Sequence, residues 1–387
     1  MAISNRVGPP VTGDDFFGRV EELSRAHEYL DSNHSLVLSA PRRIGKSSFA
    51  KRLITDKKEL GWNCAYIDLE GVRTKDEFLQ ILINQFDKSE LWTEAVNVAG
   101  SFVNRIFEGI KSIGPVEFNF SHQEIPKDLY TSLAQVINHN KDSLIVIDEL
   151  TLFLSVLDKN DDSHKDAAFF LNWFRSLRQV TDSKIRWVFC GSVGLHNFTR
   201  MRNLSMTIND LISFDFDALS YDEASGLIKA LAESEGVPFS EQMTTYLLDK
   251  IEWHIPYFIQ LLFTNIKNHP GAKNGVTQQM IESAFEKLAH AEDLSTWSER
   301  LSEYSGLEDG TRLLLKGLCQ ANDGLSREQL LNIYALYSED NPIKRDKDLS
   351  TILNMIEHDG YVMRTKEGIR RFRSPLLKKW WYYNFVE

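Results

Sequence analysis

Residues 35–49 read Ser35-Leu36-Val37-Leu38-Ser39-Ala40-Pro41-Arg42-Arg43-Ile44-Gly45-Lys46-Ser47-Ser48-Phe49, which predicts an apolar strand, a tight loop and the first turn of a helix. The loop fits the pattern Ala/Gly-x-x-x-x-Gly-Lys-Ser/Thr of a nucleotide-phosphate loop. In such a loop, backbone N–H groups and the helix N-terminus offer donors and partial positive charge to a polyphosphate. A chance Gly-Lys-Ser in a surface turn is the alternative, and the flanking strand and helix patterns disfavour it.

Each residue type in this loop has a chemical task. Gly45 gives the backbone freedom for close approach to a phosphate. Lys46 places a positive charge at the β- and γ-phosphates, and the Ser47 hydroxyl can ligate Mg²⁺. Ala40 stands where the pattern more often has glycine. The residues expected to contact the nucleotide are Pro41, Arg42, Arg43, Ile44, Gly45, Lys46, Ser47 and Ser48.

A second apolar run ends in two carboxylates. It reads Ser143-Leu144-Ile145-Val146-Ile147-Asp148-Glu149-Leu150 and predicts a buried strand. Asp148 is expected to order the Mg²⁺ shell, and Glu149 to orient and polarise the attacking water. Both strands must then end on one edge of a parallel sheet, where ligands of such folds collect. The alternative is that Asp148 and Glu149 simply begin a helix.

The composition is that of an ordinary globular protein of two or three domains. The chain has 387 residues, of which 42% are hydrophobic and 26% charged. The first residues lack a signal-peptide pattern and no stretch approaches about 18 apolar residues, so we expect a cytoplasmic protein without a membrane partner. The three cysteines, Cys64, Cys190 and Cys319, are far apart and predict no structural zinc.

Charge is unevenly distributed. The formal net charge of −11 argues against non-specific coating of nucleic acid. From residue 310 to the end, however, the chain has 13 Lys and Arg against 10 Asp and Glu. Any DNA contact is therefore expected in the C-terminal part.

Phe17-Gly18-Arg19, the Glu-Glu-Leu helix after it and the Pro-Arg-Arg-x-Gly-Lys-Ser loop together resemble prokaryotic ATPases of the STAND and archaeal type within the AAA+ class. The resemblance covers nearly the whole chain. It implies an α/β P-loop NTPase with an ASCE/AAA+-like parallel sheet flanked by helices, a helical lid and a winged helix, with ATP or ADP and Mg²⁺ as cofactors. Phe17, Gly18 and Arg19 are then expected to flank the adenine, with plain core packing as the alternative for Phe17.

The resemblance also implies roles for residues further along the chain. Ser192, at the end of the apolar run 185–192, matches a γ-phosphate sensor, and Arg200 or Arg202 an arginine finger. A simple turn and solvated arginines are the alternatives. Pro256 matches a lid proline near the base, although His254 replaces the usual glycine of that segment. We expect His254 to pack or to hydrogen-bond within the lid.

Three segments are predicted: an ATPase core (1–217), a helical lid (218–300) and a winged helix (301–387). Ser220 and Glu223 predict a capping box at the start of the lid, and Ser326 and Gln329 predict another in the winged helix. The third helix of the winged helix, read from Leu349 onward, has no Lys or Arg on its exposed face. The wing carries five cationic residues: Arg364, Lys366, Arg370, Arg371 and Arg373.

The leading interpretation is a Mg²⁺-dependent ATPase that acts as a molecular switch, coupling nucleotide state to the engagement of a partner or of DNA through the C-terminal winged helix. One alternative is a DNA-binding ATPase that resembles origin-recognition or transposition regulators, with the wing on the DNA backbone. Another is a nucleotide-bound scaffold with negligible turnover. The resemblance further implies ATP-dependent homo-oligomerisation, because an arginine finger often comes from the next subunit.

Overall fold

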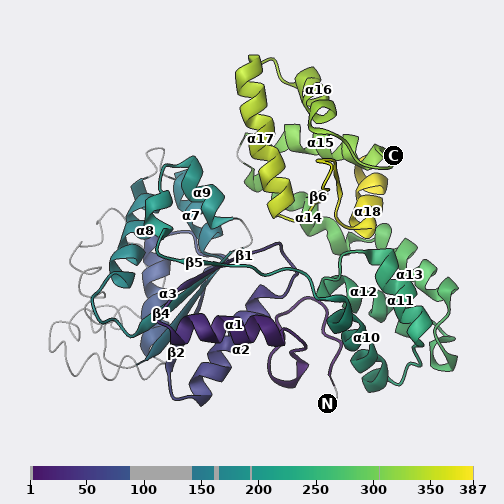
Figure 1. Ribbon diagram of the computed structural model, residues 1–387, viewed down its shortest axis with the longest axis horizontal. Coiled ribbons are helices and arrows are strands. Elements are labelled where there is room, and N and C mark those ends of the chain that lie inside the picture. Colours follow the sequence, from purple (N-terminus) through teal and green to yellow (C-terminus); the bar gives the residue numbers. More distant parts are fainter. Residues whose placement is uncertain (1–2, 88–141, 161–164, 192–193, 305, 387) are drawn as a thin grey trace. The chain divides into compact units, whose positions relative to one another are not determined.

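The computed structural model describes residues 3–87, 142–160, 165–191, 194–304 and 306–386. Figure 1 gives the labels of helices and strands used below. The helical stripes expected between residues 88 and 113 and the short strand at 116–120 lie outside the described residues. Ser192 also lies outside them.

The chain folds into two compact units. One, called here the sheet unit, comprises residues 20–39 and 49–216. The other, the loop-and-lid unit, comprises residues 1–19, 40–48 and 217–387. The phosphate-loop sequence belongs to the second unit and the strand before it to the first. The three-part division of the sequence into core, lid and winged helix stays a prediction.

The sheet unit is built on one parallel sheet of five strands. Their order is β2 (Asn63–Asp68), β3 (Ser143–Asp148), β4 (Ile185–Gly191), β1 (Leu36–Ser39) and β5 (Ile212–Phe214). The apolar runs that begin at Ser35, Ser143 and Ile185 predicted β1, β3 and β4. β3 and β4 are buried along their whole length, as expected for parallel strands covered on both faces.

Helices cover both faces of this sheet (Figure 1). On one face lie α3 (Lys75–Asp87), α7 (Leu150–Asn160), α8 (Lys165–Arg178) and α9 (Leu195–Met201). Their core is aromatic: the rings of Phe78 and Phe153 stack at 5.3 Å between centroids, and those of Trp187 and Phe189 at 5.9 Å. α1 (Val20–Asp31) and the part of α2 (Lys46–Glu59) from Phe49 onward cover the other face, where the Phe49 ring lies 5.8 Å from that of Phe214.

In the loop-and-lid unit, the chain that follows the sheet first forms a group of lid helices. They are α10 (Tyr221–Glu235), α11 (Glu241–Ile251), α12 (Pro256–Lys267) and α13 (Gln278–Ala289). The predicted capping box at the start of α10 is confirmed, because the Ser220 hydroxyl accepts from the Glu223 N–H and the Glu223 carboxylate accepts from the Ser220 N–H. The same unit begins with a short 3₁₀ turn, η1 (Gly13–Asp15).

The C-terminal region continues this unit. It contains α14 (Ser295–Glu299), α15 (Glu308–Gln320), α16 (Arg327–Tyr337), α17 (Pro342–His358), the antiparallel strands β6 (Val362–Arg364) and β7 (Arg370–Phe372), and α18 (Pro375–Phe385). The predicted capping box of Ser326 and Gln329 is confirmed. Short 3₁₀ turns connect these and earlier helices: η2 (Ser205–Ile208), η3 (Ala272–Asn274), η4 (Glu292–Leu294) and η5 (Arg300–Glu303).

One prediction for this region is wrong. The third helix, α17, begins at Pro342 and not near Leu349, so its first turns carry Lys344, Arg345 and Lys347. The statement that this helix presents no Lys or Arg therefore does not hold. The first turns were missed because their charged residues give no apolar periodicity, although Asn341 and Pro342 form an N-cap and first-turn signal.

Within the described part of the chain, every helix is too short or too polar to cross a lipid bilayer.

Candidate active site

The carboxyl ends of the central strands share one edge of the sheet, as predicted. Ser39 at the end of β1 pairs with Gly191 of β4, and Ile147 of β3 pairs with Phe189 of the same strand. β4 therefore lies between the strand that leads into the phosphate loop and the strand that ends in carboxylates. On the other side of β3, Asp148 pairs with Asp68 at the end of β2.

Asp148 is buried and held by two donors. It is 3% exposed, its Oδ1 accepts from the Glu149 N–H at 3.0 Å, and its Oδ2 accepts from the Tyr66 hydroxyl. Each carboxylate oxygen has more than one lone pair, so these bonds orient the group without exhausting its capacity to accept. The carboxylate is thus fixed at the end of β3.

Negative charge accumulates at this edge of the sheet. Burial raises the pKa of Asp68, and the nearby charges of Asp148 and Glu149 raise it further. Burial and Asp148 also raise the pKa of the Tyr66 hydroxyl, which keeps it a hydrogen-bond donor. Such a set of oxygen atoms suits a hard divalent cation, since a bound cation would compensate the repulsion among the carboxylates.

Glu149 connects β3 to α7 in an unusual backbone conformation. Its φ is +54°, in the left-handed region that a glutamate rarely adopts. Backbone strain of this kind costs about 1–3 kcal/mol and concentrates at functional sites. The observation fits a residue whose side-chain direction matters more than its local stability.

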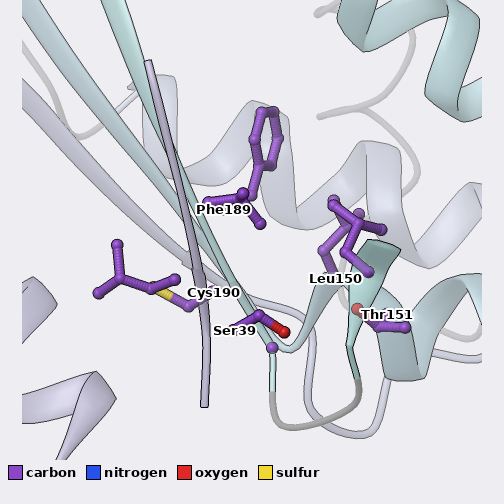
Figure 2. Close-up of a pocket in the computed structure, with 9 residues that line it drawn as sticks. Ser39, Leu150, Thr151, Phe189 and Cys190 are labelled. Carbon is purple, nitrogen blue, oxygen red and sulfur yellow. The ribbon is translucent and has the colours of Figure 1, made fainter. Parts of the chain in front are cut away.

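A small hollow lies at the same end of the sheet (Figure 2). It is lined by Val37, Leu38, Ser39, Leu150, Thr151, Phe189, Cys190, Gly191 and Leu195. Figure 2 shows the side chains of Ser39 and Thr151 on opposite sides of it. The Thr151 hydroxyl is fully buried and has no hydrogen-bond partner among the described residues, and most of the side chains around it are apolar.

In the loop-and-lid unit, the lysine of the phosphate loop folds over its own loop. Lys46 is 6% exposed, and its ammonium donates to the carbonyls of Ala40 at 2.7 Å and Pro41 at 2.8 Å. It is also the first residue of α2, and Gly45 before it has a φ of +101° that favours glycine. The predicted strand–loop–helix order is confirmed.

Other residues of the loop contact the rest of this unit. The Arg43 guanidinium lies 4.6 Å from the centre of the Tyr257 ring and donates to the Gly8 carbonyl at 3.3 Å. The Ser48 hydroxyl accepts from the Val11 N–H at 3.0 Å. Arg42 and Ser47 are half-buried beside them.

The segment Phe17–Arg19 packs against the first helix of the lid. The Phe17 ring lies against Gly226 of α10. The Arg19 N–H donates to the Glu223 carboxylate at 2.6 Å, and the Arg19 guanidinium donates to the carbonyls of Ile44 at 3.1 Å and Ala218 at 3.5 Å. Phe17 thus packs against α10, and its contact with a base stays a prediction.

Pro256 and His254 lie at the start of α12. Pro256 is the first residue of that helix. The His254 ring lies within hydrogen-bond distance of the Leu248 carbonyl, 3.3 Å from Nε2, and its edge meets the Tyr221 ring. These contacts agree with the expected packing role of His254.

The two candidate arginine fingers differ. The Arg202 guanidinium pairs with Asp158 and lies over the Phe198 ring at 3.8 Å from its centre. Arg200 is exposed and donates to the Asn197 side chain at 3.1 Å. Of the two, Arg200 is the more accessible to a second molecule, and both assignments stay predictions.

Tyr66 and Asp68 are the neighbours of Asp148 that the sequence did not indicate. They depend on the register between β2 and β3, two strands that are about 80 residues apart in sequence. The only available signal was that Tyr66 and Asp68 alternate with apolar residues in a predicted strand.

Among the described residues, no group of three or more His, Cys, Asp or Glu side chains could hold a metal ion by itself. Cys64, Cys190 and Cys319 are buried, and none of them is part of a disulfide. A cation site here would instead combine single protein ligands with phosphate oxygens and water, as Mg²⁺ sites of nucleotide enzymes do.

Two solved structures are similar to this chain over nearly its whole length. The Walker-type ATPase PABY2304 of Pyrococcus abyssi matches 97% of this chain and 99% of its own, with a TM-score of 0.66 and 13% identity. The ORC2 protein of Aeropyrum pernix, solved as ADPNP–ADP complexes, matches 96% of both chains, with a TM-score of 0.56 and 13% identity. No family model matches the sequence, and no curated protein matches it. Both likenesses show the fold: a parallel five-stranded sheet flanked by helices, followed by a helical C-terminal region.

Proposed function

We propose that this protein binds ATP with Mg²⁺, hydrolyses it, and passes the nucleotide state to its C-terminal region, which we interpret as a winged helix. The observation that carries the proposal is the order of strands at the functional edge of the sheet. β1, which leads directly into the phosphate-loop sequence, is separated by one strand from β3, which ends in Asp148 and Glu149. In parallel α/β sheets ligands collect at this edge, which supports a single nucleotide site for the two motifs.

The residues present fit a magnesium ion. Ser47 and Asp148 would hold it, with the remaining positions filled by phosphate oxygens and water. The ion would supply positive charge for the phosphates. Asp68, Asp148 and Glu149 lie together at the ends of β2 and β3, and this grouping of carboxylates favours a cation.

For hydrolysis, the chain offers Glu149 as the group that orients and polarises water. Lys46 would bind the β- and γ-phosphates, exchanging the carbonyls of Ala40 and Pro41 for phosphate oxygens. Ser192 as γ-phosphate sensor, and Arg200 as a finger acting on a neighbouring subunit, complete the proposal. An ATP-dependent homo-oligomer belongs to the same proposal.

The coupling to the C-terminal region is supported by contacts inside the loop-and-lid unit. Pro41 of the phosphate loop and Trp253 of the lid both lie against Gly360, which follows α17. A side chain at Gly360 would come within 2.5 Å of the Trp253 ring and 2.9 Å of Pro41. A shift of the phosphate loop on nucleotide binding would therefore act on the turn between α17 and β6.

Ion pairs attach the β6–β7 hairpin to the lid as well. The Arg373 guanidinium donates to both carboxylate oxygens of Asp217, at 2.6 and 2.7 Å, and lies over the Trp253 ring. Arg371 pairs with Glu252 at 2.7 Å. Both ion pairs involve exposed carboxylates, so a conformational change can break them, as a switch requires.

The same ion pairs weaken the DNA-binding alternative. Of the five cationic residues assigned to the wing, Arg370, Arg371 and Arg373 each pair with a carboxylate of their own unit, Arg370 with Glu357 at 2.8 Å. A hairpin used in this way offers less charge to a DNA backbone. We therefore favour a protein partner over DNA.

The test is a comparison of binding with turnover. The wild-type protein should bind ATP and release phosphate only with Mg²⁺. Glu149→Gln should keep ATP binding within about threefold and lose about 10²- to 10⁴-fold in turnover, the usual contribution of a general base. Glu70→Gln, an exposed carboxylate after β2, is the matched control and should retain full turnover. Equal turnover in wild-type and Glu149→Gln protein would refute the hydrolytic role, and failure of the wild type to bind ATP would refute the whole proposal.

A further inference from the structure

Arg19 has an unusual environment for a residue expected near a nucleotide base. It is 3% exposed and has a φ of +64°. Its guanidinium donates to two backbone carbonyls, that of Ile44 at 3.1 Å and that of Ala218 at 3.5 Å. Ile44 directly precedes Gly45 and Lys46 in the phosphate loop, and Ala218 lies just before α10.

The bond to Ile44 determines the direction of one peptide group. In a trans peptide, the C=O of one residue and the N–H of the next point in opposite directions. Because the Ile44 carbonyl faces Arg19, the Gly45 N–H faces away from Arg19. The N–H groups at this point of a phosphate loop are the ones that bind phosphate oxygens.

The backbone around Arg19 is fixed as well. Its N–H donates at 2.6 Å to Glu223, which also caps α10. Gly18 before it has a φ of +70°, and a side chain there would come within 3.0 Å of the Glu223 carboxylate. Arg19 is therefore held by the first turn of the lid while its side chain holds the phosphate loop.

Arginine suits this position better than lysine. Its planar fork directs separate N–H groups at two acceptors at once, whereas an ammonium is a single point donor. The Ile44 side chain is fully buried beside it, so a loss of the bond would leave a buried carbonyl without this donor.

We infer that Arg19 is a positioning residue that orients the Gly45 N–H toward the nucleotide phosphates and ties this orientation to the start of α10. This inference rests on the proposed nucleotide-binding function and changes the role of Arg19 from base contact to phosphate-loop orientation. It follows that the loss of Arg19 weakens binding through the phosphates and leaves base selectivity unchanged.

The experiment measures dissociation constants of ATP, ADP and GTP by titration calorimetry for wild-type, Arg19→Lys and Arg19→Gln protein. We expect the constants of Arg19→Gln to rise about tenfold or more for all three nucleotides, the effect of one lost charge-assisted hydrogen bond. The ratio of the GTP constant to the ATP constant should stay as in the wild type. Arg19→Lys should recover part of the affinity, because it keeps the charge and one donor.

Arg186→Gln is the matched control. Arg186 is another buried arginine, 8% exposed, and its Nε donates to the Leu30 carbonyl at 3.1 Å in the sheet unit. This variant should lower the melting temperature and leave the dissociation constants unchanged. If Arg19→Gln does not fold, Arg19→Lys carries the comparison, since it retains the charge.

Two outcomes overturn the inference. A change in the GTP-to-ATP ratio in the Arg19 variants would assign Arg19 to the base, and wild-type affinities in folded Arg19 variants would leave it a purely structural role. Absence of nucleotide binding by the wild type would instead refute the proposed function itself, so the two failures are distinguishable.

Discussion

The sheet unit and the loop-and-lid unit hold their functional groups in different ways. In the sheet unit, Asp148 stands at the end of a fully buried strand and is oriented by the Tyr66 side chain from the neighbouring strand. In the loop-and-lid unit, cationic side chains bind backbone carbonyls: Lys46 those of Ala40 and Pro41, and Arg19 that of Ile44. Asp148 is thus placed by a buried strand and oriented by hydrogen bonds, whereas the phosphate loop is held by cationic side chains on its backbone carbonyls.

This difference has a consequence for the proposed chemistry. A packed aromatic core moves little, so the groups proposed for hydrolysis should keep one geometry. A network of hydrogen bonds can exchange its partners one at a time, so the groups proposed for binding can respond to a nucleotide. Binding and turnover should therefore be separable by substitution, and each prediction below tests one side of this division.

The largest effect is expected on the binding side, at Lys46. Lys46→Ala removes the charge proposed for the β- and γ-phosphates, and the loss of two or more charge-assisted hydrogen bonds should weaken ATP binding by about 100-fold or more. Titration calorimetry measures it. Lys58→Ala, an exposed lysine in the last turn of the same helix, should bind as the wild type does. If Lys46→Ala binds ATP with the wild-type affinity, the phosphate loop is not the ATP-binding segment.

An intermediate effect is expected on the sheet side, at Tyr66. Tyr66→Phe removes the hydroxyl that donates to Asp148 but keeps the ring beside Lys51. Loss of a bond that orients a metal ligand should raise the Mg²⁺ concentration for half-maximal turnover by about tenfold, with ATP affinity in the absence of metal unchanged. Turnover at a series of Mg²⁺ concentrations measures this.

Tyr29→Phe is the matched control for that experiment, because Tyr29 lies on α1 against Phe214 in the same unit. It should leave the Mg²⁺ dependence unchanged. If Tyr66→Phe also has the wild-type Mg²⁺ dependence, Asp148 does not need the Tyr66 hydroxyl for its orientation. The proposed difference between the two units would then be wrong for the sheet unit.

Much of the sheet could be predicted from the sequence because each strand is a short apolar run followed by a polar or small residue. The end of β3 at Asp148 and the start of α2 at Lys46 follow from local patterns, since each depends on neighbours a few residues away. The order of β4 between β1 and β3 could only be taken from the resemblance, because paired residues lie far apart in the sequence, as Leu36 and Val188 of β1 and β4 do.

The partners of cationic side chains could not be predicted. Arg371 and Arg373 look like a basic patch in the sequence, but their carboxylate partners, Glu252 and Asp217, lie 119 and 156 residues earlier in the chain. The role of Arg19 could not be predicted for a similar reason. Its acceptor is the backbone carbonyl of Ile44, and every residue type has such a carbonyl. Charge in a sequence indicates where ion pairs are available and not which ones form.

The smallest effect is expected at the ion pair between Arg373 and Asp217. Burial alone raises the pKa of Asp217, but the charge and hydrogen bonds of Arg373, with the Ala218 N–H, hold it below its ordinary value of 3.8. A carboxyl with a lowered pKa in the folded state stabilises the fold above its unfolded pKa and loses this contribution as the pH falls through the folded pKa. Asp217→Asn removes the charge and leaves Arg373 over the Trp253 ring.

We expect Asp217→Asn to lower the free energy of unfolding by about 0.5–1 kcal/mol at pH 7, a small value because the Asp217 side chain is 66% exposed. Below pH 3.8 the difference from the wild type should shrink, because the wild-type carboxyl then also loses its charge. Urea unfolding at several pH values measures both, with Asp215→Asn, an exposed neighbour on the sheet side, as control. A difference that stays constant with pH would mean that the ion pair does not stabilise the attachment of the hairpin to the lid. The attachment would then depend on the packing of Trp253 against Gly360.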